Sequence, residues 1–396
     1  MSDKNLFEFL PLPQLYFGLN QFEKIGAIIQ QFGSKILVVA SKSVLTQGKT
    51  NEILTSQFSK NNIDFNVFFV KGEPEIQVID NGVEQAITEK ANTILSIGGG
   101  SVLDTGKAIS GLVTNGGKTK DFMEVIGKGK KITKQPLPHI AVPTTAGTGT
   151  EVTKNAVILS REDKLKSSIR SPLLIPKVAI IDPELTVSLP KEITASCGLD
   201  ALTQLIESYT SNKAQPITDS LALLGIEKAI SSLIRAFDEG DDLESREDMA
   251  FAALLSGICL ANAGLGAVHG FAGPIGGMFN IPHGIVCGAL LAPVLEQNIS
   301  GLISQVPYPY KLSKFVKLGE MVAEQPFETV HEAILNIVGF AKNITKILQI
   351  PKLSKFGIKI SDFETIIDKA KKSSSMKYNS VELSDDQLTK ILLQAI

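Results

Sequence analysis

The first half of the chain alternates short apolar runs with longer segments of helical pattern. The apolar runs predict buried strands at 35–40 (KILVVA), 65–70 (FNVFFV), 93–100 (TILSIGGG), 138–145 (PHIAVPTT) and 178–184 (VAIIDPE). Helical patterns such as 80–91 lie between them. This alternation predicts a parallel sheet covered by helices, with ligands at the carboxyl ends of the strands.

Beyond about Leu185 the pattern is almost entirely helical. Helices are predicted at 219–237, 246–263 and 327–348, with turns such as QVPYPY (305–310) between them. A capping signal at Ser384 and Gln387 predicts the start of a last helix. We therefore expect an α/β domain over residues 1–186 and an all-α domain over 187–396, with the active site in a cleft between them.

One long segment of the second half is nearly free of charge. Between positions 249 and 297 the single formal charge is Glu296, which by itself suggests membrane spans. Asn262, His269, Pro274 and His283 interrupt the segment, so no clean apolar span remains. We interpret it as central helices of a soluble domain that surround a polar site.

Composition narrows the class of protein. A length of 396 residues suits two domains, and 39 Lys+Arg against 41 Asp+Glu leave no basic field for nucleic acid or a membrane surface. The three cysteines form no CxxC pair and indicate reduced thiols. The first residues lack the basic and apolar regions of a signal peptide. We expect a cytoplasmic protein with a small-molecule substrate.

Two loops at the ends of predicted strands suit phosphate groups. Gly98, Gly99, Gly100 and Ser101 connect a strand to a helix, whose first amides favour an anion. The alternative is a tight turn in which Ser101 caps the helix with help from Asp104. The second loop, PTTAGTGTEVT (143–153), adds hydroxyls at the same sheet edge, and the two together favour a dinucleotide.

The residues after the first strand bear on which dinucleotide binds. Ser41 stands where a carboxylate would bind the 2′-hydroxyl of NAD, and Lys42 beside it could accept a 2′-phosphate. This pair favours NADP. NAD stays open as the alternative because Lys42 could equally be a solvated surface charge.

Polar residues in the uncharged segment suggest a metal site. Of the four histidines, His331 has the pattern of a surface residue, and His139 opens a strand and has no assigned role. His269 and His283, together with Asp200 on an apolar helix, form a donor set that suits Zn(II) or Fe(II). For each histidine alone, the alternative is an ordinary buried hydrogen bond.

The sequence resembles the iron-containing, or group III, alcohol dehydrogenase family. The motifs are GGGSVLDTGKAI, PTTAGTGTEVT, DPELT, GLDALTQLIE and NAGLGAVHGFAGPIGGMFNIPHG, in family order along nearly the whole chain. The resemblance implies an N-terminal Rossmann-like domain and a C-terminal helical domain. It also implies that a nicotinamide cofactor faces a metal across the cleft.

The resemblance assigns roles by position. It makes Asp200, His269 and His283 the metal ligands. We expect His269, His283 and Gln204 to be the catalytic residues, with Gln204 orienting the substrate. The expected cofactor-binding residues are Ser41, Glu73, Gly98, Gly99, Gly100, Ser101, Asp104, Thr144, Thr145, Thr148 and Lys166. Within that set, Lys166 and, more loosely, Glu73 are expected to bind the ribose.

This chain departs from the family pattern at three positions. Gln204 stands where the family has a metal-ligating histidine, and Gly273 replaces a further active-site histidine. Ser41 is the third departure, since NAD-using members commonly have aspartate there. Residue 204 shares a helix face with Asp200, and an amide is a poor ligand, so we interpret Gln204 as a hydrogen-bond partner of the site or substrate.

The expected activity is hydride transfer between NAD(P) and a small alcohol or aldehyde that a divalent metal polarises. The related glycerol dehydrogenases hold metal with one aspartate and two histidines, whereas maleylacetate reductases of the same superfamily use none. A metal-free reductase and a non-catalytic dinucleotide-binding sensor are therefore the alternatives. We expect Phe271, Gly273 and Phe279 to line the substrate pocket, and a homodimer or larger assembly.

Overall fold

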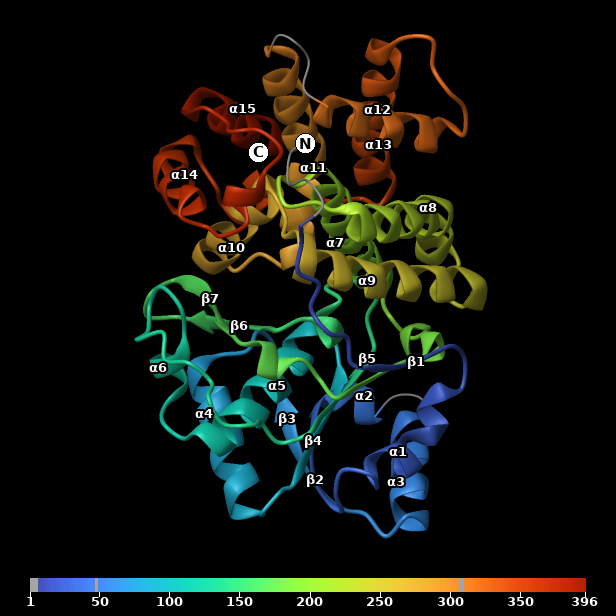
Figure 1. Ribbon diagram of the computed structural model, residues 1–396, viewed down its shortest axis with the longest axis vertical. Coiled ribbons are helices and arrows are strands. Elements are labelled where there is room, and N and C mark those ends of the chain that lie inside the picture. The colour runs from blue at the N-terminus through green and yellow to red at the C-terminus, as the bar shows by residue number, and fades with distance from the viewer. Residues whose placement is uncertain (1–5, 47–48, 306–309) are drawn as a thin grey trace. The chain divides into compact units, whose positions relative to one another are not determined.

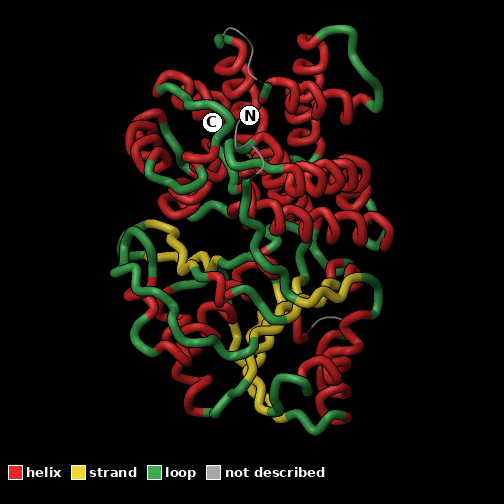
Figure 2. Tube along the Cα trace, in the orientation of Figure 1, coloured by secondary structure: helices red, strands yellow, loops and turns green. Residues whose placement is uncertain are grey.

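The computed structural model describes residues 6–46, 49–305 and 310–396, so most of the QVPYPY segment lies outside the described residues. The chain divides into two compact units. One contains Leu10–Leu189 and Gly240–Ala250, and the other contains Pro190–Glu239, Phe251–Ile396 and the described residues before Leu10. Among the described residues every strand belongs to the first unit, and Figure 2 shows that helices fill the second. The predicted fold class is confirmed.

A six-stranded parallel sheet organises the α/β unit. Its order is β1 (Gln14–Phe17), β8 (Val178–Ile181), β5 (His139–Pro143), β4 (Thr93–Gly98), β2 (Lys35–Ser41) and β3 (Asp64–Val70). The five predicted strands are present, whereas β1 was not predicted. A second, antiparallel pair was also missed, formed by β6 (Asn155–Ser160) and β7 (Leu165–Arg170).

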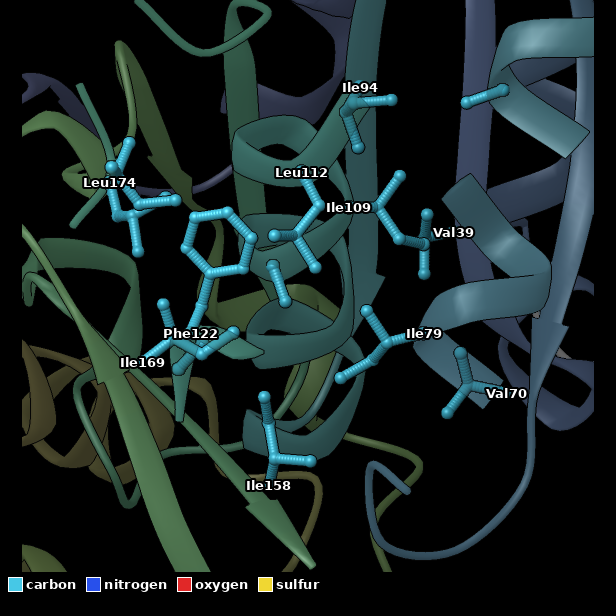
Figure 3. Close-up of a cluster of buried hydrophobic side chains, with 14 of the residues drawn as sticks. Val39, Val70, Ile79, Ile94, Ile109, Leu112, Phe122, Ile158, Ile169 and Leu174 are labelled. Carbon is cyan, nitrogen blue, oxygen red and sulfur yellow. The ribbon is translucent and has the colours of Figure 1, made fainter. Parts of the chain in front are cut away.

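Helices cover both faces of the sheet (Figure 1). On one face lie α1 (Ile25–Ile29) and α3 (Thr50–Lys60), and on the other α4 (Ile76–Thr88) and α5 (Gly100–Asn115). Alternate side chains of β2 supply the two cores: Val39 packs toward α4 and α5 (Figure 3), and Val38 toward α1 and α3. Two short helices, α2 (Lys42–Thr46) and α6 (Thr119–Phe122), complete the unit.

The sheet register brings the predicted cofactor loops to one edge. Residue Ala40 of β2 lies opposite Ile97 of β4, and Gly98 lies opposite Pro143 of β5. The chain leaves β2 for β3 on one side and returns to β4 on the other, so a topological switch point lies between β2 and β4. Such a point is where open α/β sheets bind ligands.

The helical unit is built around α7. Its helices are α7 (Lys191–Thr210), α8 (Pro216–Asp238), α10 (Ala267–Phe279), α11 (His283–Ile303), α12 (Lys311–Ala323), α13 (Val330–Ile347), α14 (Phe363–Lys371) and α15 (Asp385–Ala395), while α9 (Leu243–Ala263) contributes residues to both units. Helix α7 is buried along almost its whole length and packs on α8 and α11. The predicted capping box at Ser384 is present at the start of α15.

Helix α11 has the length and composition of a membrane span. Helices α9 and α10 together are also long and apolar enough for one span, but the chain bends by 101° between them. However, 67% of the most apolar window of α11 is buried inside the protein. That burial is typical of a core helix and agrees with our interpretation of the uncharged segment.

Candidate functional site

Three side chains that are far apart in the sequence converge in the helical unit. Asp200 lies in the middle of α7, His269 in the first turn of α10, and His283 at the first position of α11. The Oδ1 atom of Asp200 lies 3.2 Å from His269 Nε2 and 3.6 Å from His283 Nε2. Asp200 and His269 are buried, whereas the His283 side chain is 33% exposed. The structure thus brings the predicted metal ligands together.

A fourth donor, which the sequence analysis did not assign, completes this group. Cys287 follows His283 by one helical turn, and its Sγ atom lies 3.7 Å from His269 Nε2. One ligand atom from each of Asp200, His269, His283 and Cys287 lies within 4.8 Å of the others. A carboxylate, two imidazoles and a thiol are the donor types that Zn(II) and Fe(II) use in proteins, so the residues fit such a metal.

The carboxylate of Glu207 fixes the orientation of His269. It accepts hydrogen bonds from the backbone amides of Val268 (2.6 Å) and His269 (3.4 Å), and lies 2.6 Å from His269 Nδ1. A carboxylate accepts the Nδ1 proton, which leaves Nε2 directed at Asp200 as the ligand atom. The same contacts satisfy amides in the first turn of α10, so one side chain holds both the helix start and the ring.

Gln204 lies beside the candidate ligands as a hydrogen-bond partner. Its Nε2 donates to Oδ2 of Asp200 at 3.3 Å, while its Oε1 accepts from the Ser256 hydroxyl at 3.1 Å. The amide therefore holds the second oxygen of Asp200 and leaves Oδ1 directed at the two histidines. In this arrangement Gln204 positions Asp200.

Electrostatics in the group favour a charged aspartate. Burial opposes the charge of Asp200, but the rings of His283 and His269 hold its pKa below the usual value. Burial alone would lower the pKa of His269, whereas the Cys287 sulfur and the carboxylates of Asp200 and Glu207 raise it well above the usual range. Burial raises the pKa of the Cys287 thiol to about 12. A metal bound here would meet the charge of Asp200 and would displace the proton that this environment holds on the His269 ring.

The two predicted cofactor loops lie side by side in the α/β unit. The amide of Thr144 donates to the carbonyl of Gly98 at 3.0 Å. A Cβ at Gly100 would approach Thr148 Oγ1 to 2.8 Å, and one at Gly99 would lie 3.2 Å from Thr145, so both glycines allow close packing of the loops. The α5 helix has Gly99 as its N-cap without a side-chain hydrogen bond, and the alternative in which Ser101 is the cap is wrong.

Asp104 faces the protein interior. Its two oxygens accept from the Thr150 hydroxyl and from the Val157 amide at 3.0 Å. Lys107, one turn later, is fully buried and donates to the carbonyls of Thr150 (2.7 Å) and Asn155 (2.6 Å). Together they tie the second loop to α5. A direct cofactor contact by Asp104 stays a prediction.

The other predicted ribose contacts fall into two places. Lys166 on β7 donates to the Glu73 carboxylate at 2.8 Å, so the structure pairs these two residues. Ser41 ends β2, and its hydroxyl lies 3.1 Å from that of Ser43.

Comparison with known proteins decides the family. Residues 13–183 match the model described as iron-containing alcohol dehydrogenase, and residues 194–396 match its C-terminal family model. A choline dehydrogenase of Bacillus subtilis is 34% identical over 93% of this chain and 90% of its own. The crystal structure of a 1,3-propanediol oxidoreductase superposes with a TM-score of 0.91 at 31% identity, over 99% of this chain and 100% of the other. A sulfoacetaldehyde reductase of Bifidobacterium kashiwanohense, solved with NAD⁺, has a TM-score of 0.85 at 25% identity over 98% of both chains.

The chain belongs to the iron-containing alcohol dehydrogenase family. This alcohol dehydrogenase is accordingly an oxidoreductase that acts on CH–OH groups. The resemblance drawn from the sequence motifs is confirmed.

Sequence reasoning missed several residues of this alcohol dehydrogenase's site. Cys287 was interpreted as an ordinary buried thiol, although its spacing of four from His283 places both on one helix face. Glu207 lies seven residues after Asp200, which is again the same face of α7. Lys107 gave no signal, because a lysine inside an apolar helix pattern has no distinctive spacing. Phe271 is fully buried, and its place beside the substrate pocket stays a prediction.

Proposed function

We propose that the enzyme is a metal-dependent, NADP-preferring dehydrogenase or reductase of small alcohols and aldehydes. The observation that carries this proposal is the convergence of Asp200 Oδ1 with the Nε2 atoms of His269 and His283, at 3.2 and 3.6 Å. Three buried or half-buried donors of these types seldom meet without a function.

In this proposal Asp200, His269 and His283 would hold a divalent metal, which when bound would supply Lewis acidity at the substrate oxygen, and the nicotinamide would supply or accept the hydride. Glu207 holds the His269 ring in the ligating tautomer, and Gln204 holds the far oxygen of Asp200. His283 is the most exposed of the three, so substrate access is expected on its side.

The glycine and threonine loops are proposed to bind the dinucleotide. The uncapped start of α5 offers amides and a partial positive charge to the pyrophosphate. Lys107 and Asp104 keep the threonine loop against that helix start. At the adenosine end, Ser41 and Lys42 favour a 2′-phosphate, since no carboxylate stands at the end of β2 to repel it.

The space for substrate is proposed to lie beside Gly273. This residue lies one helical turn after His269 on α10, and a Cβ added to it would meet nothing within 4 Å. The histidine of other family members is absent here, which leaves room near a ligand. Phe279, which is half-buried at the end of α10, remains a proposed wall of that space.

The experiment measures NADPH oxidation over a panel of aldehydes, together with metal content after purification without chelator. We expect about one metal per chain, and loss of both metal and turnover in His283→Ala. A metal-free enzyme with full activity would favour the reductase without metal. Tight cofactor binding with no turnover on any substrate would favour the sensor.

A further inference from the structure

The donor group of the helical unit contains one side chain that neither the family pattern nor the proposed mechanism uses. Cys287 is fully buried on α11, four residues after His283. It lies against His269, whereas Gln204, at the position of the missing histidine, turns its amide nitrogen toward Asp200. The thiol of Cys287, a soft donor, is therefore available on α11, whereas the glutamine that replaces the family's histidine lies on α7.

Three of the six separations between the donor atoms are close to those of ligands that share one metal ion. Bond lengths of about 2.0 to 2.1 Å for oxygen and nitrogen and about 2.3 Å for sulfur give tetrahedral edges of roughly 3.3 Å between N and O and roughly 3.6 Å between N and S. The observed values are 3.2 and 3.6 Å from Asp200 to the two histidines, and 3.7 Å from Cys287 Sγ to His269 Nε2.

We propose that Cys287 is a fourth metal ligand that compensates for glutamine at position 204, and that the metal is accordingly zinc. The proposal rests on the metal-dependent function given above. Binding converts the thiol to thiolate and releases its proton to solvent. A thiolate beside a carboxylate and two imidazoles favours Zn(II) over the harder Fe(II).

Neighbouring side chains support this role for the sulfur. Glu207 contacts His269, and Gln204 contacts Asp200. Two of the other three proposed ligands are therefore held in position beside Cys287. His283 and Cys287 lie on one face of the same rigid helix, and α11 packs directly on α7. Ligands on packed helices keep their separations better than ligands on loops.

Cobalt(II) is the probe, because a Co(II)–thiolate bond gives a near-ultraviolet charge-transfer band that nitrogen and oxygen ligands do not give. The metal-stripped full-length protein is titrated with cobalt and followed by absorbance. We expect one equivalent to bind, with visible ligand-field bands and the charge-transfer band together. Cys287→Ser should lose the charge-transfer band, keep the visible bands and bind zinc at least about tenfold more weakly.

The matched control is Cys259→Ser, since Cys259 is also fully buried in the same unit but contacts the Thr218 carbonyl. It should keep both kinds of band. One bound cobalt without a charge-transfer band in the wild-type protein, or a band that persists in Cys287→Ser, overturns the proposal and leaves the metal-dependent function standing. Failure to bind cobalt at all overturns both. The wild-type spectrum decides even if a variant does not fold.

Discussion

Replacing Glu207 with glutamine tests how the histidine ligand is held. In the native protein the carboxylate accepts from the Val268 amide and the His269 ring at 2.6 Å each. A glutamine has one acceptor oxygen and one NH₂ group, so it must turn the NH₂ toward one of these two donors. One of the two hydrogen bonds is therefore lost, and because a hydrogen bond to a charged group is worth about 1.5 to 3 kcal/mol, we expect a loss of that size in the free energy of unfolding.

The same substitution should weaken metal binding. Without a carboxylate on Nδ1 the His269 ring can turn or change tautomer, and loss of such a partner costs about 10- to 100-fold in metal affinity. Denaturant unfolding of the metal-stripped protein measures the first effect, and chelator competition for zinc the second. Glu192→Gln, an exposed position in the first turn of α7, is the control and should change neither. A folded Glu207→Gln variant with zinc affinity within about twofold of the wild type would refute this reasoning.

Three further predictions address the cofactor, the substrate and acid stability. Ser41→Asp should weaken NADPH binding at least about tenfold in a fluorescence titration, because the new carboxylate repels the 2′-phosphate; an unchanged ratio of NADPH to NADH affinity would contradict the assignment. Gly273→Leu should lower kcat/KM for branched aldehydes by about tenfold or more and change acetaldehyde much less; equal losses on both would remove Gly273 from the substrate space. His139 is buried against Ser96, and burial lowers its pKa from 6.5 to about 3. The pKa of His139 is lower in the folded than in the unfolded protein, so protonation of this ring favours unfolding. The free energy of unfolding is therefore at its full value above pH 6.5 and decreases as the pH falls toward 3. Between pH 7.5 and 5 the wild type should lose about 2 kcal/mol more than His139→Gln in urea unfolding, and equal losses would contradict the assigned pKa.

The strands that the sequence predicted share one physical feature. Residues 36–40 are continuously apolar and residues 93–98 are buried at every position, because both faces of a parallel sheet are covered. The missed elements lack this signal. The β1 strand is four residues long and partly exposed at the sheet edge, and β7 reads LKSSIR, in which only Leu165 and Ile169 are apolar. Short edge strands and small hairpins carry too few buried residues for a pattern to stand out.

The candidate site could be predicted only where the residue types, in their apolar surroundings, are by themselves typical of metal ligands. Two histidines and an aspartate inside an apolar segment are costly to bury, and they pointed to the metal site. Cys287 and Glu207 did not stand out, because a buried cysteine is ordinary in a core and a helix periodicity alone does not say what faces it. Their roles depend on contacts between α7, α10 and α11 that only the folded chain supplies.

The central claim is that turnover depends on a metal held by Asp200, His269 and His283. The most direct measurement compares NADPH-dependent aldehyde reduction by the full-length enzyme before metal removal, after removal by a chelator, and after reloading with zinc, with metal content determined at each step. We expect activity to fall at least about a hundredfold on removal and to return with one metal per chain. Undiminished turnover by protein shown to be free of metal would contradict the claim.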